Sequence, residues 1–158
     1  MLLNDEEHAN IYTTFTAVEP DGAYRPIDGL TQLSKVLEAK LVEYNESNAM
    51  MDLVLFDDAM SHISRIARII SNPAGNAMLI GVGGSGKQSL TKLAAFICGY
   101  ETKQLEVTSA YSENDFKEDI KLFDTLCCSK DTPMVLLMTD SQIVNDRFPV
   151  SYTHLRAH

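Results

Sequence analysis

Residues 81–89 read GVGGSGKQS, and this glycine-rich stretch decides the fold of the chain. Its first part fits the pattern G-x-x-x-x-G-K, in which a tight turn of glycines ends in a lysine. Glycines reach positive φ angles and let successive N–H groups close around a phosphate. Lys87 adds a full positive charge, and a helix that begins there adds the positive end of its dipole. The stretch therefore predicts a nucleotide-binding loop made of Gly81, Val82, Gly83, Gly84, Ser85, Gly86, Lys87, Gln88 and Ser89.

The segments on both sides of the loop predict an α/β fold. Residues 76–80 form a short apolar run, which indicates a buried strand that leads into the loop. Lys87 to about Cys98 has helical spacing of apolar residues, and Gly99 is the expected residue after its end. We expect further strands at residues 104–107 and 133–138, with a helix between them. This alternation predicts a parallel sheet with flanking helices at residues 76–149, the part of the chain that carries the P-loop.

The part before the core, residues 1–75, is predicted to be a lead-in followed by two helices. Turn signals around Pro20 and Pro26 indicate irregular or extended chain. Apolar residues at three- and four-residue steps then predict an amphipathic helix from Leu30 to Tyr44. A second helix runs from about residue 59 to 70, with Asp57 or Asp58 as its N-cap.

Composition narrows the function classes. The chain has 158 residues, 45% of them hydrophobic, and a formal net charge of −9. That charge argues against nucleic acid or an anionic membrane as partner, but not against ATP, which such a loop binds through local dipoles and one lysine. No apolar run is long enough to span a bilayer, and the first residues do not resemble a signal peptide. Three cysteines, two of them adjacent, indicate reduced thiols rather than a disulfide framework.

The last residues, 150–158, read VSYTHLRAH. This string resembles one reading frame of a transposase-type sequencing adapter, so we exclude it from the fold as non-native sequence. The alternative is a short natural basic tail.

A second stretch, residues 135–140, reads VLLMTD and resembles a Walker B strand. Its terminal Asp140 is predicted to hold Mg²⁺, although a strand-end aspartate can also cap the following segment. Two departures weaken catalysis. Gln88 replaces the Ser or Thr whose hydroxyl binds Mg²⁺, and Ser141 stands where a glutamate would polarise water. We therefore assign no catalytic residue and predict ATP or ADP binding with poor or absent hydrolysis.

Four segments together carry a family resemblance. Residues 51–60 (MDLVLFDDAM), 75–90 (GNAMLIGVGGSGKQSL), 114–119 (NDFKED) and 139–143 (TDSQI) resemble a dynein heavy chain. The GKQS and TDSQI variants are similar to the fourth AAA+ module of the axonemal type. The resemblance implies a nucleotide-binding, regulatory module of a ciliary microtubule motor. It also implies that residues 53–56 lie near the adenine, where the residues themselves indicate only core packing.

The resemblance further implies the setting of the chain. Neighbouring AAA+ modules, dynein intermediate and light chains and microtubules are the implied partners, in the cytoplasm and the cytoskeleton of the ciliary axoneme. In the family's sheet, the strand before the loop pairs with two strands that come after Asp140, and neither follows in this sequence. We therefore expect a marginally stable piece that binds ATP weakly.

Two other functions stay open from the residues alone. One is a P-loop kinase or GTPase, although the N-K-x-D pattern that reads guanine is absent from the sequence. The other is an interaction domain whose nucleotide site is vestigial. Measurements of nucleotide preference and turnover would distinguish these two functions from the regulatory ATP-binding module.

Overall fold

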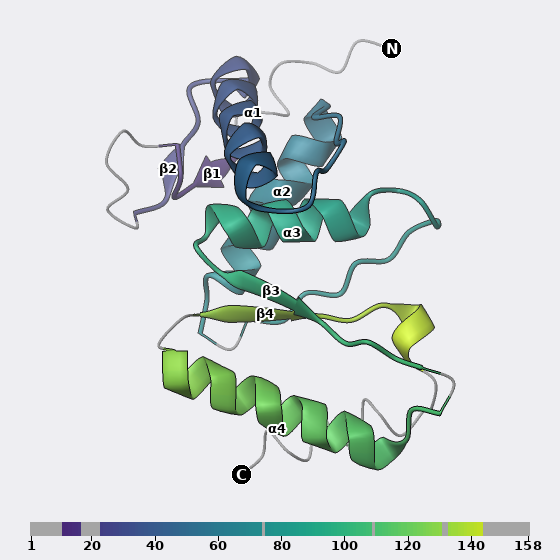
Figure 1. The fold of residues 1–158 in the computed structure, drawn as a ribbon. Coiled ribbons are helices and arrows are strands. Elements are labelled where there is room, and N and C mark those ends of the chain that lie inside the picture. Colours follow the sequence, from purple (N-terminus) through teal and green to yellow (C-terminus); the bar gives the residue numbers. More distant parts are fainter. Residues whose placement is uncertain (1–10, 17–22, 74, 109, 131–132, 144–158) are drawn as a thin grey trace. The chain divides into compact units, whose positions relative to one another are not determined.

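The computed structural model describes residues 11–16, 23–73, 75–108, 110–130 and 133–143 (Figure 1). The predicted tail at 150–158 lies outside the described residues. The chain divides into two compact units, Met1–Gly99 and Tyr100–His158, which we describe separately. The α/β class predicted from the sequence is confirmed.

The first unit is a helical assembly around one apolar core (Figure 1). It contains α1 (Leu30–Ser47), α2 (Asp57–Ile70) and α3 (Lys87–Ile97), preceded by the short antiparallel pair β1 (Tyr12–Thr13) and β2 (Arg25–Pro26). Each helix buries the face that its apolar spacing predicts, so all three predicted helices are confirmed. The buried core residues are Leu33, Leu37, Ala59, Met60, Ile63, Ile66, Ala67, Leu90, Leu93 and Ala94. The helix that follows the glycine-rich loop is therefore anchored in this core.

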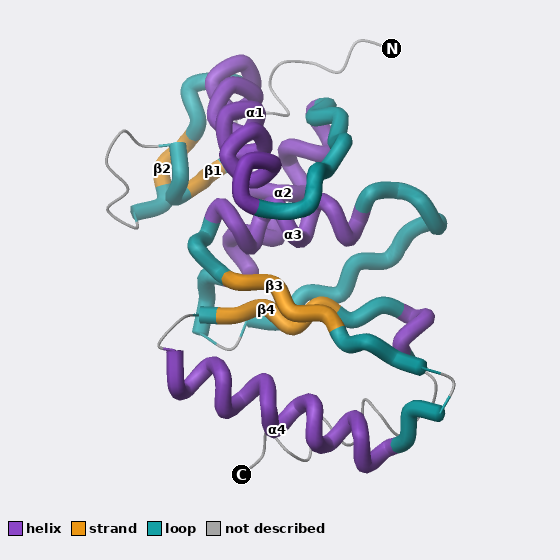
Figure 2. Tube along the Cα trace, viewed as in Figure 1, coloured by secondary structure: helices purple, strands orange, loops and turns teal. Residues whose placement is uncertain are grey.

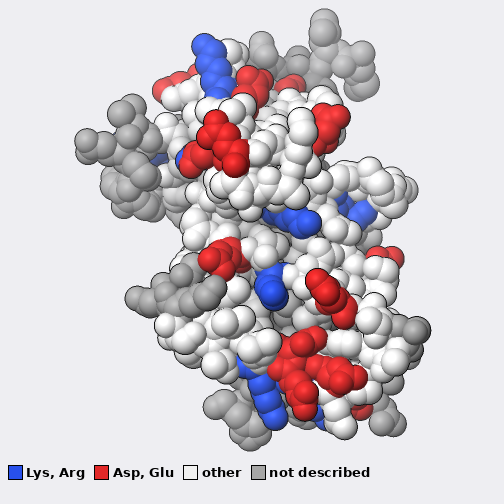
Figure 3. Space-filling view, in the orientation of Figure 1, with Lys and Arg blue, Asp and Glu red and all other residues white. Residues whose placement is uncertain are grey.

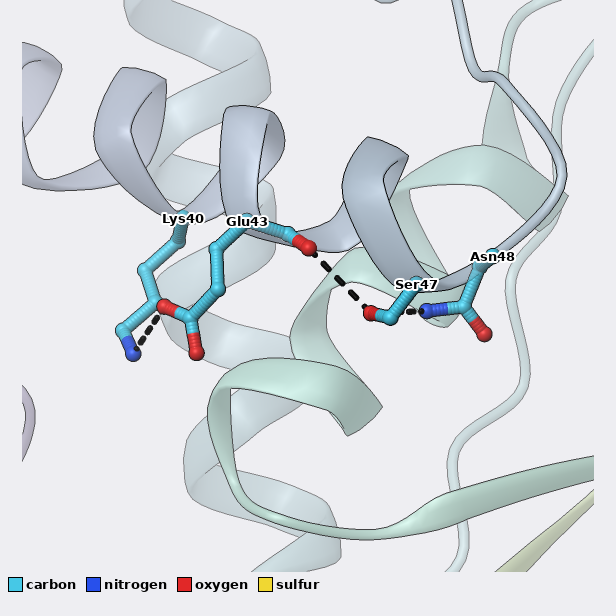
Figure 4. Close-up of polar contacts among 4 residues, drawn as sticks. All are labelled: Lys40, Glu43, Ser47 and Asn48. Atoms are coloured by element: carbon cyan, nitrogen blue, oxygen red, sulfur yellow. Dashed lines mark hydrogen bonds and ion pairs between the residues drawn. The ribbon is translucent and has the colours of Figure 1, made fainter.

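The C-terminal end of α1 is closed by its own side chains (Figure 4). The Ser47 hydroxyl donates to the carbonyl oxygen of Glu43 at 3.2 Å, and the Asn48 amide donates to the Ser47 oxygen at 3.1 Å. One turn earlier, the Lys40 ammonium pairs with the Glu43 carboxylate at 2.7 Å. The last four carbonyls of a helix lack partners within the helix, and the Asn48 amide also donates to one of them, that of Tyr44, at 3.2 Å.

Two local predictions in this unit are wrong. Phe56, not Asp57 or Asp58, is the N-cap of α2, and both aspartates lie in the first helical turn. There their negative charges still interact favourably with the positive end of the helix dipole, although no side chain makes a capping hydrogen bond. Residues 76–80 form no strand, and Met78 and Ile80 are 87% and 86% exposed. No described strand pairs with this segment, and Figure 2 draws it as loop. Of its large apolar side chains, only Leu79 packs against the core.

The second unit holds the parallel pair β3 (Glu101–Gln104) and β4 (Met134–Leu137), the helix α4 (Glu113–Lys130) and the 3₁₀ turn η1 (Asp140–Gln142). β4 and α4 confirm the predicted strand and helix, and the parallel pairing is confirmed. β3, however, begins three residues before the predicted strand at 104–107. It ends at Gln104, which pairs with Leu137 of β4. Leu105 is buried with Phe116 and Ile120 of α4 in a small apolar core.

The N-terminus of α4 is fixed by reciprocal hydrogen bonds between Ser112 and Asp115. The Asp115 carboxylate accepts from both the Ser112 N–H and the Ser112 hydroxyl at 2.7 Å, and the Asp115 N–H donates to the Ser112 oxygen at 3.3 Å. The Ser112 hydroxyl bond is the main reason that the pKa of Asp115 lies below its usual value. Figure 3 shows the largest group of acidic side chains in the part of the picture where α4 is drawn.

Among the described residues, none of the helices has the length and apolar character that a membrane span needs.

Candidate functional site

The glycine-rich loop is shaped by two glycines in left-handed backbone conformation. Gly84 has φ 76° and Gly86 has φ 75°, a region that residues with a Cβ avoid. Gly86 is the N-cap of α3, and its carbonyl accepts the first helical hydrogen bond, from Leu90, at 2.9 Å. A Cβ built on Gly83 or Gly84 would meet no atom within 4 Å. The loop is thus a turn that only glycines can form at these two positions, and it leads directly into the N-terminus of α3.

Lys87 folds back over the loop and holds it closed. Its ammonium group donates to the carbonyl oxygen of Gly81 at 2.8 Å and to that of Val82 at 2.6 Å. A third bond goes to the Ser85 hydroxyl at 3.1 Å. The one cation of the motif therefore lies at the mouth of the loop, next to the exposed residues 81–85. A phosphate that enters the loop would meet this ammonium group first.

The remaining two predicted loop residues differ in exposure. Gln88 is exposed, whereas Ser89 is half-buried, and both lie in the first turn of α3. Successive residues of a helix point about 100° apart, so the two side chains leave the helix in different directions.

A second segment of the first unit lies beside the loop. The side chain of Leu53 comes within 3.8 Å of the position that a Cβ on Gly86 would take. Leu53 and Leu55 pack on the helical core, while Val54 and Phe56, which alternate with them, are 74% and 59% exposed. The start of this segment is held by Asn45, whose amide oxygen accepts from the Met51 N–H at 2.8 Å. Core packing, the alternative for this run, accounts for the two leucines only.

Asp140, the predicted metal ligand, lies at the first position of η1 in the second unit. Its side chain is exposed, and its backbone carbonyl accepts from the Ile143 N–H at 3.1 Å. The cap of this turn is Thr139, so the alternative role of Asp140 as a cap does not hold. Among the described residues, no group of three or more His, Cys, Asp or Glu side chains could hold a metal ion.

Sequence reasoning missed Gln142, two residues after Asp140. Its side chain is 8% exposed, and its amide nitrogen donates to the carbonyl oxygen of Leu105. Its amide oxygen accepts from the Thr139 N–H at 2.8 Å. A glutamine three residues after a threonine is a capping-box signal, so the spacing T-x-x-Q could have revealed it.

The structure and the sequence together define the class of this protein as a P-loop nucleotide-binding α/β module. Comparison with known families then gives the family itself: residues 51–155 match the family described as "P-loop containing dynein motor region D4". The chain belongs to this family of dynein heavy-chain regions.

Curated relatives agree with this assignment. The chain is similar to the flagellar outer-arm dynein beta chain of Chlamydomonas reinhardtii, with 52% identity over 92% of the chain. The outer-arm alpha chain of the same organism is 51% identical over 89%. Human dynein axonemal heavy chain 17 is 45% identical over 94%. The chain spans about 3% of the length of each of these relatives. A P-loop AAA module of this family implies nucleotide binding in general, which confirms the kind of ligand predicted from residues 81–89.

Proposed function

We propose that this chain is the ATP-binding part of an axonemal dynein motor module, with a regulatory role and weak or no hydrolysis. The observation that carries the proposal is the closed arrangement of Lys87 over a loop built on left-handed Gly84 and Gly86. The nest of N–H groups, the helix dipole and one ammonium group all favour the same ligand, a polyphosphate. The site would comprise residues 81–89 and would exchange the Lys87 bonds to loop carbonyls for bonds to phosphate oxygens.

The base and the metal of the nucleotide are assigned to two other segments of the chain. We propose that exposed Val54 and Phe56 contribute to the adenine pocket, because their segment reaches Gly86 through Leu53. The resemblance implies Asp140 as a ligand of Mg²⁺, and the exposed Gln88 would supply at most a neutral amide oxygen. Mg²⁺ prefers charged oxygen ligands in octahedral geometry, so this set favours weak metal positioning.

Weak hydrolysis follows from Ser141. A serine hydroxyl is a poor general base, and this one shares a 2.9 Å hydrogen bond with the Thr139 hydroxyl. The proposed regulatory role also depends on Ser141. A site that binds a nucleotide without hydrolysing it can act only through whether the nucleotide is bound. We also propose that residues 1–75 form a lead-in with helices, followed by a P-loop core at residues 76–149.

The wider setting is proposed from the relatives. Axonemal and flagellar outer-arm names among them support a place in the ciliary axoneme and a dynein complex around the chain. Neighbouring AAA+ modules, intermediate and light chains and microtubules would be partners through the longer heavy chain.

The test compares equilibrium binding of labelled ATP and GTP to the chain and to Lys87→Ala. Lys92→Ala is the matched control, because it removes the same charge from the same helix. We expect ATP preference, no turnover and a loss of affinity of about 10-fold or more in Lys87→Ala only, since hydrogen bonds to charged groups contribute about 1.5–3 kcal/mol. Turnover or guanine preference would favour a kinase or GTPase, and equal binding by both lysine variants would leave only a vestigial site.

A further inference from the structure

The ammonium group of Lys87 has three N–H donors, and all three are used within the glycine-rich loop. Two of them donate to backbone carbonyl oxygens, those of Gly81 at 2.8 Å and Val82 at 2.6 Å. The third donates to the hydroxyl oxygen of Ser85 at 3.1 Å, the longest of the three bonds. A phosphate oxygen can therefore bind this ammonium group only by replacing one of these partners.

The three partners differ in what they can offer to a phosphate. A carbonyl oxygen only accepts hydrogen bonds, so the carbonyls of Gly81 and Val82 compete with a phosphate oxygen for the ammonium group. A serine hydroxyl has one donor and two acceptor lone pairs, so it can accept from Lys87 and donate to a phosphate oxygen at the same time. Ser85 is thus the partner of the ammonium group that can stay in place when a phosphate binds.

The Ser85 hydroxyl and the Lys87 ammonium group lie close together at the start of the loop. A Cβ built on Gly81 would lie 3.6 Å from the Ser85 hydroxyl oxygen and 3.7 Å from Lys87 Nζ. Ser85 is exposed, and a Cβ on Gly83 or Gly84 just before it would meet no atom within 4 Å. A ligand from solvent can therefore approach the hydroxyl through open space.

The backbone beside Ser85 has unused donors as well. In the part of the chain that the structure describes, the N–H groups of residues 83–86 donate no backbone hydrogen bond. Successive N–H groups of this kind bind anions when they point toward one place. The Ser85 hydroxyl belongs to the same stretch of chain, so it adds a side-chain donor to the backbone donors of the loop.

We propose that the hydroxyl of Ser85 binds a phosphate of the nucleotide directly and keeps the ammonium group of Lys87 beside it. When nucleotide enters, Lys87 exchanges its carbonyl bonds for phosphate oxygens and keeps its bond to Ser85, while the Ser85 hydroxyl donates its proton to a phosphate oxygen. The inference rests on the proposed function, which places a polyphosphate in this loop. It adds a second side chain that recognises the phosphate.

The experiment measures equilibrium binding of a fluorescent ATP analogue and of inorganic tripolyphosphate to the 158-residue chain in EDTA, so that no divalent metal takes part. Ser85→Ala should weaken the binding of both ligands about 10-fold, the effect of losing one hydrogen bond to a charged group. Ser85→Thr keeps the hydroxyl and should restore the affinity. Ser34→Ala is the matched control, because the Ser34 hydroxyl also bonds to a charged side chain, the Glu38 carboxylate, at 2.8 Å. It should bind both ligands as the parent does.

Lys87→Ala makes the outcomes distinguishable. Adding Ser85→Ala to it should cost less affinity than Ser85→Ala costs in the parent, because the two side chains act together on one phosphate. If the two losses are independent, Ser85 does not act together with Lys87 and the inference is wrong. If Lys87→Ala weakens binding and Ser85→Ala does not, the role of Ser85 is refuted and the proposed function stands.

Two further results would count against the role of the hydroxyl. If Ser85→Thr binds as weakly as Ser85→Ala, or if Ser85→Ala binds more tightly than the parent, the hydroxyl does not bind phosphate. If the parent binds neither ligand, or if neither Lys87→Ala nor Ser85→Ala changes the affinity, the proposed phosphate site fails, and the inference fails with it.

Discussion

Alanine substitutions at three glycines separate two effects of an added Cβ: strain in the backbone angles and steric overlap with neighbouring atoms. Gly86 has φ 75° and Gly99, at the other end of α3, has φ 74°, whereas Gly83 is not among the glycines with positive φ. A Cβ on Gly83 or Gly99 would meet nothing within 4 Å, and one on Gly86 would make only an ordinary contact with Leu53 at 3.8 Å. Steric overlap is therefore small at all three positions, and the backbone angle is what differs.

The magnitude follows from two opposing effects. A residue with a Cβ in left-handed conformation costs about 1–2 kcal/mol. Replacing glycine by alanine also restricts the unfolded chain, which stabilises the fold by about 0.4–1 kcal/mol where the native angle suits alanine. The second effect is common to all three variants and cancels in their differences. Gly86→Ala and Gly99→Ala should thus each be about 1–2 kcal/mol less stable than Gly83→Ala.

The assay is urea unfolding of each variant followed by far-ultraviolet circular dichroism. Gly86→Ala and Gly99→Ala should lower the unfolding midpoint by similar amounts, and Gly83→Ala should keep or raise it. ATP binding then adds a second comparison, because only Gly86 belongs to the loop: its variant should bind more weakly than the equally destabilised Gly99→Ala. If Gly83→Ala is as destabilised as Gly86→Ala, the reasoning from backbone angles is refuted.

Three further outcomes are expected. Phe116→Ala should lower the free energy of unfolding of the second unit by about 3–5 kcal/mol, measured by urea unfolding, because this ring is fully buried in a small core. The pKa of Asp115 is lowered in the folded state by the Ser112 hydroxyl, so its stabilisation is present above the unfolded pKa and is lost as pH falls through the folded pKa; acid titration of helicity should show a smaller loss in Asp115→Asn. Burial raises the pKa of Cys98, whereas Cys128 is exposed, so iodoacetamide followed by peptide mass analysis should modify Cys128 first.

The helices and the loop could be predicted from the sequence because their signals are local. Apolar spacing alone determines which face of α2 and α3 is buried. Gly99 was expected after α3 and has φ 74°, as the end of a helix requires. The pattern from Gly81 to Lys87 likewise predicts a turn whose angles only glycine tolerates, and Gly84 and Gly86 have those angles.

The strands were harder to predict because a strand depends on its partner. Residues 77–80 are all apolar, as are those of β4, yet they form no ladder among the described residues, and Ile80 is 86% exposed. The shift of β3 has a similar cause. Leu105 was expected inside the strand, but its carbonyl bonds to the Gln142 side chain instead of a neighbouring backbone. No pattern in residues 104–107 reveals a partner that lies so far along the chain.

The candidate site shows the same division between local and distant effects. The phosphate loop can be recognised from its own residues, since it needs only glycines, a lysine and the helix that follows. The metal side cannot, because an exposed aspartate such as Asp140 acts only where other groups hold it in place. Gln142 fixes the backbone of this turn through Thr139 and through Leu105, which lies 37 positions earlier in the chain, and no local pattern predicts a contact over that separation.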